Sequence, residues 1–326
     1  MSNVRLWLAQ NYAPILTAVV FAAMFGTYIG ESSAGWKVAI LDTAANNAVV
    51  LAIVAMAQTL VVITRGVDLS AGMIFIMANC IASALVVGSP GEVGLGIFGV
   101  LLAGTAAGLC NGLLVVLGRL PPIIVTLATG SIFSGIALSI RPTPGGSVNE
   151  SLADFMTSDI FGAIPVSLIL LLAIIVLIWV PFRMSVIGRY CYAAGSAESA
   201  AYMSGVPIGR AKLVAYTLAG LLGGIAGLFV TFVTDSGDAG ASVGGTYTLN
   251  SIAAVVIGGT SLYGGVGGAI GSIFGAFTLR TIDDLLLVFR LPPLWQPLFQ
   301  GFVLLCAVSL GAVRIFRLHN RLDGFQ

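Results

Sequence analysis

Ten apolar stretches divide this chain, and most of its charged residues lie in the short segments between them. A helix that crosses a membrane needs about 20 mainly apolar residues, and in lipid such a helix satisfies its own backbone hydrogen bonds. The expected spans are 14–30, 45–64, 70–88, 93–117, 122–140, 162–181, 211–233, 248–262, 266–282 and 297–316. The sequence therefore predicts an all-α fold, a polytopic membrane helical bundle of about ten transmembrane helices, forming a single domain over residues 1–326.

Composition places the chain in a lipid bilayer and excludes several function classes. Hydrophobic residues make up 58% of its 326 residues and charged residues only 8%, whereas a soluble domain carries roughly 25% charged residues. The net charge of +1 leaves no basic surface of the kind that binds nucleic acid. The four cysteines form no C-x-x-C pair, and the single histidine, His319, lies in the charged tail. We therefore expect no metal site, no catalytic residues, no cofactor bound by this chain, and no cleavable signal peptide.

The distribution of basic residues predicts the orientation of the bundle. Cytoplasmic loops of membrane proteins carry an excess of Lys and Arg. If the N-terminus lies inside, the internal residues are Arg5, Arg65, Arg119, Arg183, Arg189, Arg210, Lys212, Arg314, Arg317 and Arg321, and the external ones are Lys37, Arg141, Arg280 and Arg290. The excess predicts that both termini are cytoplasmic, that 182–210 is a cytoplasmic loop, and that 141–161 is an external loop.

The segment between the second and third spans, residues 64–72, carries two charges beside the membrane. Such charges are costly and usually functional. Arg65 and Asp68 are three residues apart and would pair if the segment were helical, whereas Asp68 or Ser70 would alternatively cap the third span. We take Arg65, Asp68 and Ser70 as candidate path or gate residues, and the competing interpretation is a plain cytoplasmic turn with a good cap.

The segment 255–268 is too rich in glycine for an uninterrupted helix. A broken helix is tolerated in a membrane where its backbone is buried in protein or lines a water-filled cavity. The run also echoes residues 61–69 once a gap is allowed, and transporters are often built from internal repeats with broken helices. The candidate path or gate residues in this run are Gly258, Gly259, Ser261, Gly264 and Gly265.

The cytoplasmic loop contains a predicted two-turn helix over 197–204. Ser196 is its expected N-cap, and Gly205 followed by Pro207 is its expected stop. A helix this short forms no core of its own, so its exposed side chains suit a partner protein, and the alternative is a helix that lies on the bilayer. The candidate contact residues are Glu198, Ser199, Ala201, Tyr202, Met203 and Gly205.

Four segments taken together resemble the permease subunits of ribose-type bacterial ATP-binding cassette sugar importers, a branched binding-protein-dependent transport family. They are Gly66 to Gly72, Thr126 to Leu127, Gly195 to Val206, and Val256 to Gly267, in the family's order. The resemblance runs from about residue 45 to 316. The chain departs from the family pattern at Arg65, Ser134 and Ser196, where glycine, arginine and asparagine are common.

This resemblance implies a permease that takes a monosaccharide or related small polar solute from the periplasm to the cytoplasm in the inner membrane. It implies a second copy or a sister permease, a periplasmic substrate-binding protein, and an ATPase subunit that holds ATP and Mg and binds the helix 197–204 as a coupling helix. The sequence has no G-x-x-x-x-G-K-[S/T] loop of its own. ATP hydrolysis is therefore expected on the partner chain.

The competing function is a secondary transporter of a small polar solute. Ion coupling usually requires ionisable residues deep within the spans, and few are found there, because Arg280 and Asp68 lie near span ends. An intramembrane enzyme is less favoured, since neither H-E-x-x-H nor G-x-S-x-G occurs. Polar residues at span depth either face the path or bond between helices: Gln58, Asn79, Asn111, Asn250 and Gln300.

Overall fold

The computed structural model describes residues 3–32, 38–302 and 305, and these form a helical bundle with one two-stranded hairpin. The long helices are α1 (Asn3–Glu31), α2 (Val38–Val62), α4 (Pro90–Val116), α5 (Pro122–Ile140), α11 (Ile208–Thr234) and α13 (Ala269–Val288). The sixth span is α7 (Val166–Ile174), a π-helical turn (Ile175–Trp179) and α8 (Val180–Met184). Shorter elements are α3 (Ala71–Leu85), α12 (Ala241–Ile257), α6 (Glu150–Thr157), α9 (Val186–Ser196), α10 (Glu198–Met203), a 3₁₀ turn (Pro293–Trp295), β1 (Asp159–Ile160) and β2 (Ile164–Pro165).

The prediction of an all-α polytopic membrane bundle is confirmed. Within the described residues, six helices are long and apolar enough to cross a membrane, and α3 and α12 are apolar but shorter. Each of the first nine expected spans coincides with a helix, counting α7 to α8 as one. The expected tenth span, 297–316, lies mostly outside the described residues, as does His319.

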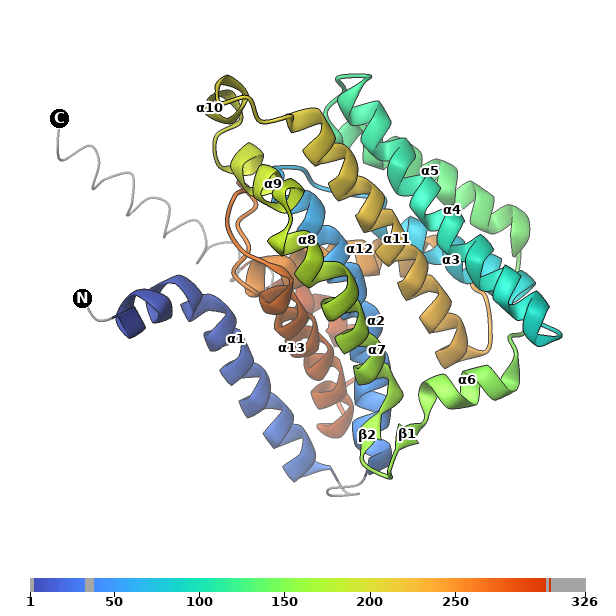
Figure 1. Ribbon diagram of the computed structural model, residues 1–326. Helices are drawn as coiled ribbons and strands as arrows, with labels where there is room; N and C mark the ends of the chain where they lie inside the picture. The colour runs from blue at the N-terminus through green and yellow to red at the C-terminus, as the bar shows by residue number, and fades with distance from the viewer. Residues whose placement is uncertain (1–2, 33–37, 303–304, 306–326) are drawn as a thin grey trace.

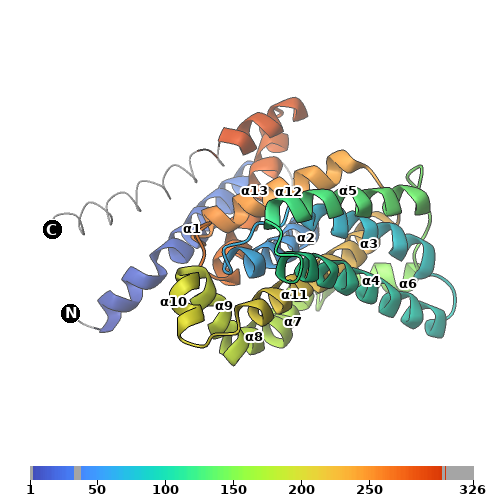
Figure 2. The same cartoon turned by 90° about the horizontal axis from the view of Figure 1, so that it is seen from above.

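Helix α2 forms the centre of the bundle, because its residues from Ala48 to Ala57 are apolar on every side. In its most apolar window 94% of the residues are buried, and α3, α11, α12 and α13 pack around it (Figure 2). A helix that is hydrophobic all round is expected to be buried in this way. Large apolar side chains on α4 and α5, such as Leu95 and Leu127, face outward. That exposure suits a bundle surrounded by lipid.

Glycines bring α4 and α11 into close contact. A Cβ atom added at Gly108 would collide with the carbonyl oxygen of Tyr216, and one added at Gly220 would collide with that of Gly104. Glycines spaced four apart let helix backbones approach in this manner. The four-residue spacing of Gly104 and Gly108 on α4, and of Gly220 and Gly224 on α11, therefore forms a packing surface at this crossing.

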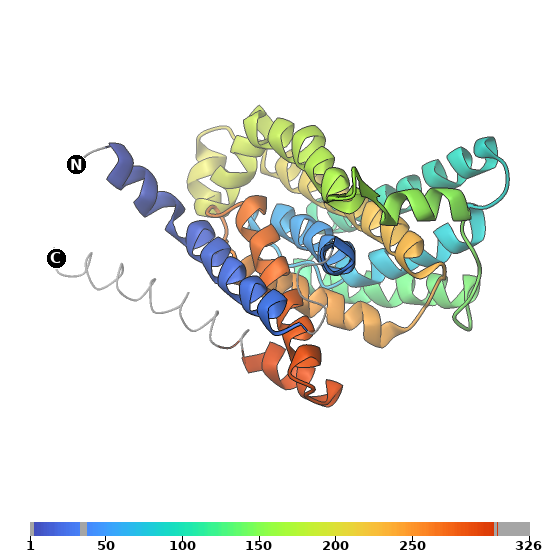
Figure 3. The same cartoon turned by 90° about the horizontal axis from the view of Figure 1, so that it is seen from below.

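The loops gather at two opposite ends of the bundle (Figure 1). The inner end, which the basic residues predict to be cytoplasmic, consists of loops 63–70, 117–121, 185–207 and 258–268. The outer end consists of loops 86–89, 141–165 and 235–240 and includes α6 and the hairpin. Figure 3 views the bundle from this outer side.

Candidate coupling site and broken helices

Helix α10 projects from the inner end on its own (Figure 1). It spans Glu198–Met203 and is one residue shorter at each end than the predicted helix 197–204. The prediction that Ser196 is its N-cap is wrong. Ser196 is the last residue of α9, where its Oγ donates to the carbonyl of Tyr192, and the chain turns at Ala197, which has an extended backbone with φ −155°.

The six residues of α10 divide into a buried anchor and an exposed face. Ala201 is buried, whereas Tyr202 is 75% exposed and Met203 is 87% exposed. Glu198 forms a salt bridge of 2.7 Å with Lys212 on α11. Exposed apolar side chains on a helix that is anchored to the bundle are typical of a protein–protein interface.

The C-terminal end of α10 is fixed by its backbone. The N–H of Val206 donates to the carbonyl of Ala201, the N–H of Gly205 donates to that of Tyr202, and Gly205 has φ +77°. This is a Schellman stop, in which a left-handed residue follows the helix. The predicted role of Gly205 as a helix stop is confirmed. Ser199 lies exposed on the same short helix.

Three segments meet directly below α10 through backbone contacts. We call them the glycine junction: Ile63, Arg65, Gly195, Ser196, Gly264 and Gly265. The N–H of Gly265 donates to the carbonyl of Ile63 at 3.0 Å. A Cβ at Gly195 would collide with that same carbonyl oxygen, and one at Gly264 would lie 2.9 Å from the N of Arg65. The end of α9 therefore contacts both helix breaks without an intervening side chain.

The two helix breaks end with the same hydrogen-bond pattern. After α2, the N–H of Gly66 donates to Val61 and that of Arg65 to Val62. After α12, the N–H of Thr260 donates to Val255 and that of Gly259 to Val256. Both are Schellman stops, with left-handed residues at Arg65 (φ 66°) and Gly259 (φ 83°). The sequence similarity between residues 61–69 and 255–268 therefore aligns Arg65 with Gly259, without a gap between the end of each helix and this residue.

The expected pair between Arg65 and Asp68 does not form. The salt bridges within the described residues are Lys212–Glu198 and Arg280–Asp283. Arg65 is exposed, whereas Asp68 is 1% exposed and accepts from the N–H of Ser70 at 2.8 Å and from its Oγ at 2.6 Å. The pairing argument assumed a helical segment, and the left-handed turn at Arg65 breaks that helix. Asp68 instead orders the start of α3.

A buried polar network supports this start of α3 from two neighbouring helices. Asn111 on α4 donates to Ser70 Oγ at 2.8 Å and accepts from Thr129 Oγ1 at 2.6 Å. Thr126 accepts from the N–H of Leu69 at 3.0 Å. The two threonines of α5 therefore fix the start of α3, Thr126 directly and Thr129 through Asn111.

Other polar residues at span depth also bond between helices. Gln58, with its amide oriented to satisfy both groups, bonds the backbone N–H and carbonyl of Asp68 at 3.2 and 3.0 Å. Asn79 donates to Thr231 and to the carbonyl of Ser236 at 2.9 Å. Gln300 donates to Asp283 at 2.9 Å, and Asn250 is half-buried on α12. For Asn79 and Asn111 the interhelical alternative therefore holds, whereas Gln58 bonds the loop that precedes α3.

The glycine loop after α12 is folded tightly onto its neighbours. A Cβ at Gly258 would collide with Gly271 on α13, and one at Gly259 with Ala13 on α1. The N–H of Ser261 donates to the carbonyl of Val266 at 3.1 Å, and Tyr192 of α9 donates to that of Gly267 at 2.8 Å. The predicted residues of this run are thus gathered at the inner end. No cluster of His, Cys, Asp and Glu suited to a metal occurs in the described part of the chain.

An apolar helical bundle with two matched helix breaks and a short exposed helix at one end is the architecture of a polytopic membrane protein. Residues 40–308 match the family described as the permease component of the branched-chain amino acid transport system. The chain belongs to this family. It is the permease subunit of an ATP-binding cassette importer, and such permeases are not themselves enzymes.

Curated relatives agree with the family. The ribose import permease protein RbsC of Bacillus subtilis (strain 168) is 35% identical over 261 residues, which cover 79% of this chain and 80% of the relative. The corresponding protein of Haemophilus influenzae (strain ATCC 51907 / DSM 11121 / KW20 / Rd) is 34% identical over 79% and 80%. The autoinducer 2 import system permease protein LsrC of Enterobacter sp. (strain 638) is 32% identical over 88% and 83%. No solved structure matches the chain.

Proposed function

We propose that this chain moves a monosaccharide or related small polar solute from the periplasm to the cytoplasm across the bacterial inner membrane. A separate ATPase subunit that holds ATP and Mg drives the movement, and a periplasmic binding protein delivers the solute. A second copy or a sister permease completes the path, and both termini lie in the cytoplasm. The ribose import permeases among the relatives support this solute class.

The observation that carries the proposal is the exposed face of α10. Tyr202 and Met203 extend away from the bundle, while Ala201 and the Glu198–Lys212 bridge attach the helix to it. A six-residue helix is too short to be stable alone, so this base is what keeps its face in one orientation. We assign Glu198, Ser199, Ala201, Tyr202, Met203 and Gly205 to the contact with the ATPase.

The glycine junction then carries motion from the ATPase into the bundle. A displacement of α10 moves α9, and Gly195 at the end of α9 presses on the backbone of Ile63 and Gly265. Closely packed interiors transmit strain, so the starts of α3 and α13 move together. We assign the inner gate of the path to the residues of these two breaks: Arg65, Asp68, Ser70, Gly258, Gly259, Ser261, Gly264 and Gly265.

The variant Tyr202→Asp tests this function. A few side chains dominate a small interface, and a carboxylate in place of the exposed ring loses apolar contact and adds a charge. We expect the permease to remain inserted while its co-purification with the ATPase falls at least about tenfold, with a matching loss of binding-protein-dependent uptake. Tyr202→Phe, which keeps the ring, should behave as the unmodified protein. Normal assembly and uptake in Tyr202→Asp would overturn the coupling assignment.

One structural feature favours the alternative of a secondary transporter. Arg280, Asp283 and Asp284 occupy one turn of α13, with 3.5 Å between Arg280 and Asp283, and ionisable residues within a span often serve ion coupling. Uptake into vesicles separates the two functions. ATP hydrolysis should sustain uptake after the proton gradient is collapsed, and uptake that follows the gradient instead would favour the alternative.

A further inference from the structure

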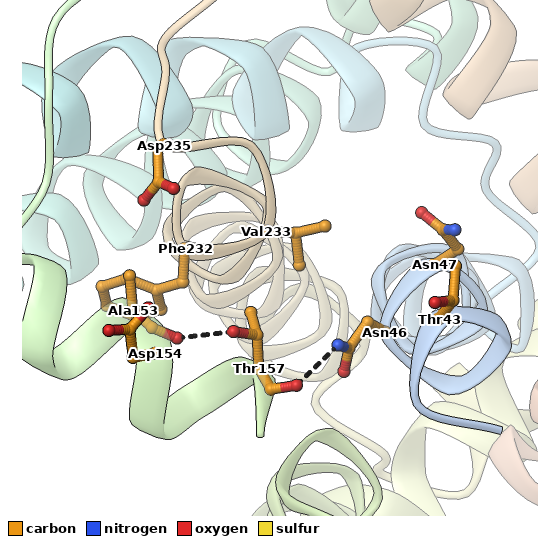
Figure 4. A pocket seen from close by; sticks show the side chains of 9 residues that line it. All are labelled: Thr43, Asn46, Asn47, Ala153, Asp154, Thr157, Phe232, Val233 and Asp235. Carbon is orange, nitrogen blue, oxygen red and sulfur yellow. Dashed lines mark hydrogen bonds between the residues drawn. The ribbon is translucent and has the colours of Figure 1, made fainter. Parts of the chain in front are cut away.

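The outer end of the bundle contains a polar cavity of about 250 Å³ between α2, α6 and the end of α11 (Figure 4). Its lining consists of Thr43, Asn46, Asn47, Ala153, Asp154, Thr157, Phe232, Val233 and Asp235. The cavity lies at the opposite end of the bundle from the glycine junction. None of the polar groups in the cavity belongs to the coupling site. The cavity is therefore a separate candidate site.

The lining is rich in hydrogen-bond acceptors and contains no basic residue. Asp154 and Asp235 contribute carboxylates, and both are exposed at the mouth. The end of α11 adds the negative end of a helix dipole next to Asp235. The electrostatic field in the cavity therefore favours a cation.

A buried amide within the cavity has an acceptor without a donor. Asn46 is 8% exposed, and its side chain extends from α2 toward Thr157, to whose carbonyl its Nδ2 donates at 3.0 Å (Figure 4). Its Oδ1 is buried and accepts from no described residue. An unsatisfied buried acceptor costs about 1–3 kcal/mol, so this atom indicates a ligand that brings a donor.

The cavity is a dead end rather than a passage. Phe232 and Ala153 in its lining are buried, and further along α2 the residues from Ala48 to Ala57 are apolar and buried without exception. A solute in transit would need a polar route into the bundle. An anchoring side chain from a partner needs only a socket that is open at one end.

We propose that this cavity is a socket for a basic side chain, preferably arginine, on the periplasmic binding protein when it docks on the permease. The inference rests on the proposed function for its partner and orientation. A guanidinium offers five N–H donors in a planar fork. Its charge complements Asp154 and Asp235, its donors suit the free acceptor of Asn46, and its aliphatic stem suits Phe232 and Val233.

The test uses the full-length permease with its ATPase in nanodiscs and measures binding of the periplasmic solute-binding protein. The variants are Asp154→Asn, Asp235→Asn and the double variant. Asparagine preserves shape, and it also tolerates the left-handed backbone of Asp235 (φ 47°). Glu150→Gln is the matched control, because it removes an exposed charge from the same short helix α6 outside the cavity.

We expect each single variant to weaken binding about tenfold and the double variant more, with faster dissociation, while Glu150→Gln changes it less than about twofold. The salt dependence of binding should also flatten in the double variant, because fewer charges are screened. Unchanged binding and salt dependence in an inserted double variant would overturn the socket. If a free monosaccharide binds the permease in a manner that Asp154 and Asp235 control, while docking is unaffected, the cavity is a solute site and the proposal fails.

Failure of the proposed function would be recognised separately. The unmodified permease would then bind neither the binding protein nor the ATPase, and Tyr202→Asp would change nothing. That outcome removes the partner on which the socket depends. Loss of docking in the cavity variants with normal ATPase assembly supports the socket specifically.

Discussion

The two ends of the bundle are held together by different means. At the inner end, backbone meets backbone at Gly195, Ile63 and Gly265, with no room for a side chain. At the outer end, the backbone pair Gly145–Gly237 is reinforced by side-chain links: Arg141 donates from Nε to Ser83 Oγ at 2.9 Å and from a terminal nitrogen to its carbonyl at 2.7 Å. Backbone atoms in close van der Waals contact transmit a displacement directly, whereas hydrogen bonds at a surface can break and reform one at a time. From this contrast we propose that the inner end transmits motion and the outer end accommodates it.

The largest effect should come from filling the inner contact. Gly195→Leu places a side chain where a Cβ already collides with the carbonyl of Ile63 and crowds the N of Gly265. Overpacking typically costs about 1–3 kcal/mol, and here the opposing atoms belong to the backbone of two helix breaks. We expect uptake to be lost while the chain still inserts, as measured by vesicle transport and membrane extraction.

Gly94→Leu is the control for this variant, because Gly94 also lies in a helix but has no atom within 4 Å of an added Cβ. Its uptake should stay close to normal. Equal losses in both variants would mean that helix propensity, rather than the junction, explains the effect. Normal uptake in Gly195→Leu would contradict the contrast between the two ends.

An intermediate effect is expected from breaking a polar link at the outer end. Arg141→Ala removes both hydrogen bonds to Ser83, while the Ser83 carbonyl still accepts from the N–H of Ser147 and its Oγ still donates to Cys80. Hydrogen bonds to a charged group contribute about 1.5–3 kcal/mol. The melting temperature of the detergent-solubilised permease should fall, whereas co-purification with the ATPase should persist. If this variant instead disrupts ATPase binding as strongly as Tyr202→Asp, the two ends are not separable.

The smallest effect should come from relieving the strained helix stop. Arg65 adopts a left-handed backbone (φ 66°), which costs an L-residue roughly 1–2 kcal/mol, and part of that is returned by the entropy of glycine in the unfolded chain. Arg65→Gly should raise stability by up to about 1 kcal/mol, measured as a small rise in melting temperature. The reciprocal Gly259→Arg should lower it, because its Cβ collides with Ala13. A fall in melting temperature for Arg65→Gly would contradict the strain assigned to the left-handed stop.

Hydropathy was sufficient to predict most of the fold. The spans from 14–30 to 266–282 each coincide with a helix, because an apolar stretch of that length has no other stable state in lipid. The glycine run 255–268 and the stop at Gly205 were also readable, since glycine has a local preference for a left-handed backbone.

The features of the site that were not predicted from the sequence depend on contacts between segments that are distant in the chain. The Arg65–Asp68 prediction failed because a three-residue spacing implies a pair only on a helix, and the turn at Arg65 is not visible in a non-glycine residue. The outer cavity joins residues 43–47, 153–157 and 232–235, which no local pattern connects. In the sequence, Thr126 cannot be distinguished from any other hydroxyl residue in a span. Only the structure shows that its Oγ1 accepts from the N–H of Leu69.

The central position of α2 has a consequence for how the chain is made. Its neighbours α11, α12 and α13 are synthesised late, and Ile208 follows Val62 by 146 residues. At a translation rate of about 5–20 residues per second, α2 waits roughly 7–30 seconds for them. During that interval these later neighbours are absent, so the apolar side chains from Ala48 to Ala57 suit contact with lipid before they pack against those helices. Thr59, which donates to Ser272 of α13 in the finished bundle, lacks that partner until α13 is made.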